Sequence, residues 1–349
     1  MLHKGRGAQI QTKNSFLKQE KSNAHVEGID DFEEAVIPTK YLQESAKSIV
    51  NRVKSPDIGP EWSLNPYQGC EHGCIYCYAR NAHEYYGFSA GLDFETNIMV
   101  KKNAPELLRA FFDKRGWVPA PIVLSGNTDC YQPAEKKLGI TRKLLEVFLE
   151  YKNPVGIITK NSLVLRDADI LTELAKLNLV HVNLSITSLN EETRLKLEPR
   201  TATAKKRLQT VSELAGLGIP VRVMAAPLIP FINMDELPSI MQAAADAGAS
   251  DVAYTLVRLN GSLAELFTDW IRKQNPDKAE RVLAQIKSLH GGRLNNSEYG
   301  KRMRGSGELA EITAQQHKLW HKRLFADKSI PAYDLSLFKR PESGQLQLF

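Results

Sequence analysis

The sequence predicts an α/β protein built as a partial (β/α)6 TIM-like barrel, with a flexible N-terminal arm and a mainly helical C-terminal extension. Between about residues 60 and 260, short β-branched runs alternate with longer helical patterns, as in repeated βαβ units around a parallel sheet. The run count gives six βα units, too few for a closed eight-stranded barrel. No Gly-x-Gly-x-x-Gly follows the first strand, which argues against a dinucleotide-binding sheet.

The expected elements follow one another in a regular order. A first strand is expected near residues 62–67. Five further runs have the length of buried parallel strands, at residues 121–125, 155–159, 180–185, 219–224 and 251–256. Helical periodicity occupies the segments between them, at residues 135–151, 166–178, 203–217 and 235–248.

Three segments divide the chain. Residues 1–59 are expected to form an N-terminal arm and a short helix, because positions 1–35 are polar without periodicity and residues 40–54 suit a helix. Residues 60–260 form the barrel. Residues 261–349 form a helical C-terminal extension that ends in an extended tail.

Composition indicates an ordinary globular protein with a mildly basic surface. The 349 residues are 42% hydrophobic and 25% charged, with a net charge of +6. The N-terminus has no secretory signal, and no apolar run approaches the roughly 20 residues of a spanning helix. We therefore expect a cytoplasmic protein. Six cations crowd one stretch, in which Glu198 is the single acid, so this stretch either holds phosphates or forms a solvated helix face: Arg194, Lys196, Arg200, Lys205, Lys206 and Arg207.

Three of the four cysteines form a compact motif. Cys70, Cys74 and Cys77 have the spacing Cys-x3-Cys-x2-Cys. They are too close together to pair well as disulfides, so we expect metal ligands. Three thiolates suit three corners of a cubane [4Fe–4S] cluster, whereas an electron-transfer cluster uses a fourth Cys. The open iron can bind the amino and carboxylate groups of S-adenosylmethionine (SAM), whose reductive cleavage yields a 5′-deoxyadenosyl radical. The alternative is zinc held by the same cysteines with His72 or Cys130 as the fourth ligand.

The cysteine motif resembles that of the radical SAM superfamily, which places an aromatic residue just before the last cysteine. The longer string Asn-Pro-Tyr-Gln-Gly-Cys-x-His-Gly-Cys-x-Tyr-Cys-Tyr-Ala-Arg at residues 65–80 resembles the branch that contains spore photoproduct lyase and its uncharacterised relatives. The resemblance covers roughly residues 60–260. It implies the partial (β/α)6 barrel, an enzyme with lyase-like radical chemistry, and an electron donor of the flavodoxin or ferredoxin type.

The resemblance also assigns roles to single residues. Tyr76 stands where the superfamily places an aromatic ring against the SAM adenine; its alternative role is loop packing. Thr128, Lys160 and Ser185 stand at the carboxyl ends of expected strands, where βα barrels build their active sites. Similar residues of the lyase contact SAM, so all three are candidate SAM contacts. Lys160 can instead be a solvated strand end.

Two further residues are candidates for hydrogen-atom transfer. Cys130 lies in the loop after the 121–125 strand, where the lyase has a reactive cysteine that gives a hydrogen atom to the product radical. The lyase cysteine aligns with Gly126, so the offset of Cys130 argues against thymine-dimer chemistry itself; a small buried residue is the alternative. Tyr78 matches a lyase tyrosine proposed as a hydrogen relay, and can equally be a core residue.

Three functions follow from these observations. The leading hypothesis is a radical SAM enzyme acting on nucleic acid, in DNA repair or modification. The second is a radical SAM enzyme acting on a peptide or small molecule. The third is a zinc-stabilised nucleic-acid-binding module without catalysis.

The last residues add a candidate partner. Gln345, Leu346, Leu348 and Phe349 belong to a terminal Gln-Leu-x-Leu-Phe sequence that resembles the pentapeptide by which bacterial polymerases and repair proteins bind the replication sliding clamp. The alternative is that these apolar residues pack onto the protein's own barrel.

Overall fold

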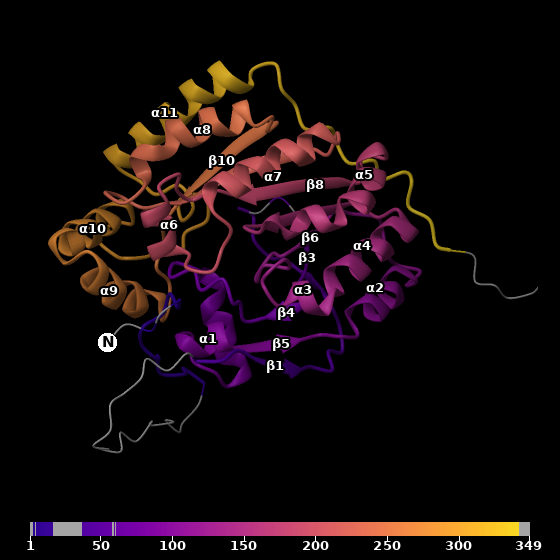
Figure 1. The fold of residues 1–349 in the computed structure, drawn as a ribbon, viewed down its shortest axis with the longest axis horizontal. Helices are drawn as coiled ribbons and strands as arrows, with labels where there is room; N and C mark the ends of the chain where they lie inside the picture. The colour runs from indigo at the N-terminus through magenta and orange to yellow at the C-terminus, as the bar shows by residue number, and fades with distance from the viewer. Residues whose placement is uncertain (1–2, 4, 17–36, 58, 60, 342–349) are drawn as a thin grey trace, which may run out of the picture.

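The central feature of the fold is a twisted, open parallel sheet (Figure 1). The computed structural model describes residues 3, 5–16, 37–57, 59 and 61–341. Within these residues the sheet has seven strands in the order β10-β9-β8-β7-β6-β3-β2. Their bounds are β2 Val50–Arg52, β3 Trp62–Leu64, β6 Ile122–Leu124, β7 Val155–Thr159, β8 Val180–Ser185, β9 Val221–Leu228 and β10 Asp251–Leu256. All neighbours are parallel except β2 and β3.

The predicted βα repeat is confirmed. From β3 to β10, consecutive sheet strands are neighbours, and helices fill the intervals between β6 and β10 as expected. These helices are α3 Glu135–Leu138, α4 Ile140–Tyr151, α5 Ala168–Lys176, α7 Ala204–Gly216 and α8 Leu237–Asp246. Helix α4 shows why: Leu144, Leu145 and Phe148 are buried at helical spacing against the sheet. The fold is thus the partial TIM-like barrel that the sequence predicts.

The remaining elements lie before the barrel repeat or in its loops. A second sheet has the order β1-β5-β4. Its strands are β1 Lys40–Gln43, β4 Tyr67–Gln68 and β5 Asn97–Val100. The other helical segments are η1 Tyr78–Tyr86, α1 Leu92–Thr96, α2 Ala104–Phe112, η2 Ser162–Asp167, α6 Glu191–Leu197 and η3 Met234–Glu236.

The prediction of a short helix over residues 40–54 is wrong. Lys40–Gln43 pairs in parallel with Asn97–Val100, and Val50–Arg52 pairs antiparallel with Trp62–Leu64. Partners distant in sequence supply the backbone hydrogen bonds, and this pairing overrides a weak local helical pattern.

The flexible arm is also wrong for its described residues. Residues 5–16 lie against the segment that runs from the cysteine loop to α1, and Ala8 is fully buried. Asn14 donates hydrogen bonds to the carbonyls of Glu84 and Phe88, and Phe16 stacks on Tyr85. Polar composition misled the prediction because these side chains find partners on the folded body rather than in water.

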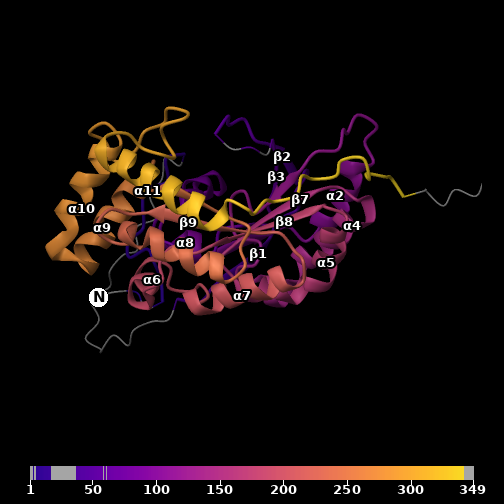
Figure 2. The same ribbon diagram turned by 90° about the horizontal axis from the view of Figure 1, so that it is seen from above.

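The C-terminal extension is helical, as expected. It contains α9 Leu263–Gln274, α10 Pro276–Leu289 and α11 Glu308–Phe325. Helices α9 and α10 share a hydrophobic cluster with Ile75 of the cysteine loop, so the extension supports that loop. After α11 the chain crosses the amino ends of the strands toward α2 and α4 (Figure 2). Every helix among the described residues is too short or too polar to cross a membrane.

Candidate active site at the mouth of the barrel

The three cysteines lie on the loop between β4 and η1, at the carboxyl ends of the barrel strands. The Cys70 amide donates to the carbonyl of Phe94 at 2.9 Å, and the Ile75 amide donates to the carbonyl of Leu197 at 3.1 Å. Gly73, between two of the cysteines, has a φ of +69°, and a Cβ there would lie 2.8 Å from the Glu95 carboxylate. Only glycine fits this turn.

A buried ion pair fixes the cysteine loop from behind. The Arg80 guanidinium donates to Glu95 at 2.6 Å and to the Cys74 carbonyl at 3.0 Å. The same Glu95 carboxylate accepts hydrogen bonds from the amides of Gly7 and Ala8. A Cβ on Gly7 would lie 1.7 Å from the Gly73 carbonyl oxygen, so the N-terminal segment lies directly on the loop.

The thiols themselves fit an iron–sulfur cluster. Cys70 and Cys74 are each 6% exposed, Cys77 is half-buried, and all three are free. Burial raises the pKa of the Cys70 and Cys74 thiols, so a bound cation is needed to hold them as thiolates. Three free thiols in a loop built from glycine turns are the donor set of a cluster with one open iron.

The fourth ligands considered for zinc are engaged elsewhere. The His72 ring lies 3.3 Å from the Asp129 carboxylate on one side and 3.4 Å from the Asn161 amide on the other. Cys130 is fully buried in the main core, whereas Cys70 and Cys74 belong to separate clusters.

Asp129 joins the cysteine loop to two barrel strands. Besides His72, its carboxylate accepts hydrogen bonds from the Thr159 hydroxyl at 2.8 Å and the Lys160 amide at 2.9 Å. Burial alone would raise the pKa of Asp129, but His72 and the backbone amides of Lys160 and Tyr131, which donate to the carboxylate, outweigh it and lower the pKa.

Lys160 and Tyr76 meet at the barrel mouth. The Lys160 ammonium lies 6.0 Å from the centre of the Tyr76 ring and has no hydrogen bond or ion pair to a described residue. Burial disfavours the Lys160 charge, but Cys74, Glu198 and Asp129 outweigh this and raise its pKa. A half-buried cation without an anionic partner is suited to an anionic group of a ligand.

Thr128 and Ser185 have different surroundings. The Thr128 hydroxyl is buried and donates to the Tyr67 carbonyl at 2.5 Å, so within the protein its donor is already used. Ser185 ends β8, and its carbonyl accepts a hydrogen bond from Arg207 at 2.9 Å.

The two hydrogen-transfer candidates also differ. Cys130 is 0% exposed; its amide donates to the Ser125 hydroxyl, and its carbonyl accepts from Thr141. Tyr78 is 49% exposed, and its hydroxyl donates to the Gly126 carbonyl at 2.6 Å. Tyr78 therefore lies at the mouth beside the loop that holds Cys130, with the thiol behind that loop.

The basic stretch does not form one cationic patch. Arg194 and Arg207 are buried, Arg194 against Glu191 and Arg207 against Glu198. Glu198 also accepts hydrogen bonds from Thr187 and Tyr76, which makes it a buried hub that sequence reasoning missed. Its signal in the sequence was its position as the single acid among six cations.

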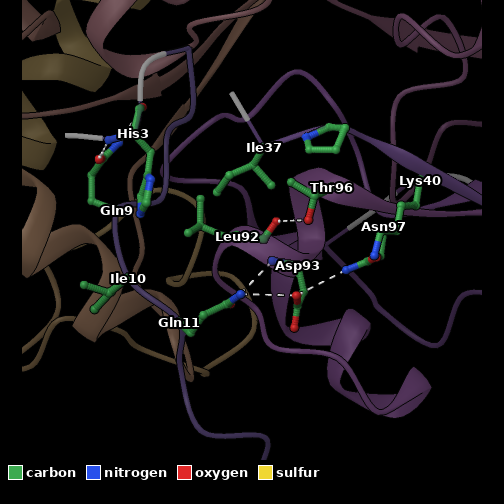
Figure 3. Close-up of a pocket in the computed structure, with 11 residues that line it drawn as sticks. His3, Gln9, Ile10, Gln11, Ile37, Lys40, Leu92, Asp93, Thr96 and Asn97 are labelled. Atoms are coloured by element: carbon green, nitrogen blue, oxygen red, sulfur yellow. Dashed lines mark hydrogen bonds between the residues drawn. The ribbon is translucent and has the colours of Figure 1, made fainter. Parts of the chain in front are cut away.

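A separate hollow of about 470 Å³ lies between the N-terminal segment and α1 (Figure 3). His3, Gln11, Ile37, Leu92 and Asp93 are among the residues that line it. None of the candidate site residues does.

Sequence comparison identifies the family. Residues 64–244, more than half of the chain, match the model of the radical SAM superfamily. An uncharacterized protein of Mycobacterium tuberculosis is 31% identical over 238 residues, which cover 67% of this chain and 70% of that protein. An uncharacterized protein of Methanocaldococcus jannaschii is 30% identical over 191 residues, 55% of this chain and 68% of that protein.

Structural comparison agrees at the level of the fold. Spore photoproduct lyase complexed with dinucleoside spore photoproduct has a TM-score of 0.60 at 16% identity, over 82% of this chain and 79% of that chain. A lyase variant with bound AdoMet and the same ligand has a TM-score of 0.62 at 16% identity, over 87% of this chain and 86% of that chain. The chain belongs to the radical SAM superfamily and is an enzyme whose family uses an iron–sulfur cluster and SAM.

Proposed function

We propose that this radical SAM enzyme holds a [4Fe–4S] cluster on Cys70, Cys74 and Cys77 and cleaves SAM reductively to start radical chemistry on a nucleic acid. The observation that carries the proposal is the placement of three free thiols, two buried and one half-buried, near Lys160, whose ammonium has no hydrogen bond or ion pair with a described residue. When bound, the cluster supplies one electron to the SAM sulfonium.

The residues of the mouth divide the work of holding SAM. Lys160 pairs with the SAM carboxylate, because it is the unpaired ammonium near the cysteine loop. The Tyr76 ring supports the adenine, since an aromatic face orients a base at low entropic cost. Ser185, the last residue of β8, and Thr128, in the loop after β6, contribute further contacts to SAM. Tyr78 and Cys130 take part afterwards, in hydrogen transfer at the substrate.

Two arginines at the mouth support an anionic substrate. The Arg200 amide donates to the His72 carbonyl, which places this exposed arginine beside the cysteine loop. Arg258 follows β10, is half-buried near Tyr78, and has no ion pair with a described residue. One structural neighbour carries a dinucleoside ligand. The two arginines favour recognition of an anionic backbone such as a phosphodiester, and the neighbour's ligand favours a nucleic acid as its source.

The proposal is tested by anaerobic reconstitution with iron, sulfide, dithionite and SAM. We expect a brown protein with broad absorbance near 400 nm and release of 5′-deoxyadenosine. A colourless protein that retains zinc and leaves SAM intact would overturn the catalytic proposal.

The substrate is tested separately by charge reversal. Arg200→Glu and Arg258→Glu should each weaken single-stranded DNA binding and reduce its salt dependence, whereas reversal of exposed Lys339, at the opposite end of the barrel, should change binding less. Equal DNA binding by all three variants would favour an uncharged peptide or small molecule.

The C-terminal residues Gln345, Leu346, Leu348 and Phe349 lie outside the described residues, and clamp docking stands as a proposal from sequence. The described chain approaches them along the end of the barrel opposite the mouth, where Arg340 donates to the Phe112 carbonyl. A pull-down of the host clamp with the full chain, and with Leu348 and Phe349 changed to Ala, tests it. Equal recovery from both proteins, or none from either, would exclude docking through this sequence.

A further inference from the structure

A buried network of side chains, formed by Tyr76, Thr187 and Arg207, centres on the carboxylate of Glu198. The hydroxyl donates to one oxygen of the Glu198 carboxylate, and the Thr187 hydroxyl donates to the same oxygen at 2.6 Å. Arg207 donates to the other oxygen at 2.5 Å. Glu198 and Arg207 are at most 1% exposed. Neighbouring charges, Arg207 above all, keep the Glu198 carboxylate ionised despite its burial.

This network connects two candidate SAM contacts, Tyr76 and Ser185. Arg207 also donates to the Ser185 carbonyl at 2.9 Å and to the Ala202 carbonyl at 2.8 Å. Glu198 therefore bridges the Tyr76 ring, next to Cys77, and the carboxyl end of β8. A buried ion pair is weak evidence for stability, because desolvation offsets most of its attraction. Its recognised use is to specify one arrangement of the groups it joins.

We propose that Glu198 is a positioning residue for SAM: it fixes the plane of the Tyr76 ring and, through Arg207, the position of Ser185. This inference rests on the proposed function and deepens it. A Phe at position 76 would offer the same face to adenine but would be free to turn. Ligand binding would then have to order that ring, and the ordering would cost affinity.

A second buried network in the same protein, formed by Tyr67, Glu135 and Arg166, provides a matched control. The Tyr67 hydroxyl donates to Glu135 at 2.5 Å, and Arg166 donates to the other Glu135 oxygen at 2.7 Å. Tyr67 and Glu135 are fully buried, as Glu198 is, whereas Tyr76 is 8% exposed; the Tyr67 ring belongs to the main core. Tyr67→Phe removes this hydroxyl but keeps the Tyr67 carbonyl that accepts from Thr128, so it reports the structural part of the effect.

The test compares Tyr76→Phe with Tyr67→Phe in the reconstituted holoenzyme. SAM affinity is measured by equilibrium dialysis, and stability by thermal unfolding. We expect Tyr76→Phe to weaken SAM binding about fivefold, the order of one newly immobilised side chain. Tyr67→Phe should lower the melting temperature to a similar extent and leave SAM affinity within about twofold. Unchanged SAM affinity in Tyr76→Phe, or equal losses in both variants, would overturn the positioning role.

Glu198→Gln supplies the second arm. If Glu198 acts through the Tyr76 hydroxyl, the variant that combines Tyr76→Phe with Glu198→Gln should bind SAM no more weakly than Glu198→Gln alone, because the two residues act as a unit. Additive losses would contradict the proposal. Where Glu198→Gln fails to fold, Tyr76→Phe decides alone. SAM cleavage by the wild-type holoenzyme tests the proposed function independently, so failure of one inference is distinguishable from failure of the other.

Discussion

The two ends of the barrel are built from different chemistry. At the carboxyl ends of the strands lie the cysteine loop, the buried carboxylate of Glu198, and the half-buried charges of Asp129 and Lys160. At the amino ends lies an aromatic cluster in which Trp62, Phe111 and Trp117 have ring centres 4.7–5.9 Å apart. The first end is equipped for ligands, and the second is packed like an ordinary core.

The C-terminal segment closes the aromatic end. Tyr333 stacks on His181 with ring centres 3.9 Å apart, and Phe338 packs edge-on against Phe112 at 5.9 Å. The Lys339 amide donates to the Tyr151 carbonyl at the amino end of β7. Burial of aromatic surface at the amino ends stabilises the folded protein. Charges removed from water at the mouth instead carry a desolvation penalty. The groups that stabilise the fold and the groups suited to cofactor chemistry therefore lie at opposite ends of the strands.

The strongest way to break this comparison is at the cysteine loop. Cys70→Ala, Cys74→Ala or Cys77→Ala should each abolish the bound cluster, because each thiolate holds one iron of the cubane. Iron and sulfide content with the 400 nm absorbance measure the effect. Cys130→Ala is the control: it should retain the cluster and SAM cleavage but misdirect the substrate radical. Loss of iron in Cys130→Ala would refute the three-ligand assignment.

The next largest effect is expected at Lys160. Lys160→Met should retain the cluster but weaken SAM binding by about 30-fold, since it removes a charge-assisted contact to the SAM carboxylate. Equilibrium dialysis of the reconstituted protein measures this. Lys339→Met, an exposed lysine at the closed end, should leave the affinity unchanged. Equal affinity in both variants would remove Lys160 from the site.

Low pH should destabilise the part of the fold that supports the cysteine loop, because His83 becomes protonated there. This ring is fully buried between Phe88 and Phe94, and burial lowers its pKa to about 4. The folded pKa lies below the unfolded value, so stability is complete above about pH 6.5 and is lost as pH falls toward 4, by about 3 kcal/mol at pH 4. Unfolding of wild type and His83→Phe from pH 7 to 4 measures the difference. Parallel curves would show that His83 does not contribute.

The smallest effect is expected at the closed end. Phe338→Ala should lower the free energy of unfolding by about 2 kcal/mol, because the ring is half-buried against Phe112 and Tyr151. Cluster content and SAM affinity should not change. A variant that unfolds no more readily than wild type, or that loses iron, would show that the two ends are not independent.

Local sequence determined the barrel strands, the helices between them and the cysteine loop. Period and length are set by neighbouring residues, so the run at 155–159 and the helix around Leu144 were readable without a structure. The Cys-x3-Cys-x2-Cys spacing likewise carries its chemistry within eight residues.

Tertiary structure alone decided which residues meet across long sequence distances. Residues 5–16 have no periodicity, yet Glu95 fixes Gly7 and Ala8 from almost 90 positions away. Lys40–Gln43 is a strand only because Asn97–Val100 lies beside it. Glu198 belongs to the site because the fold brings Tyr76, 122 positions away, to its carboxylate. Such contacts depend on where the folded chain places each group, and no local pattern of hydrophobicity or charge encodes that placement.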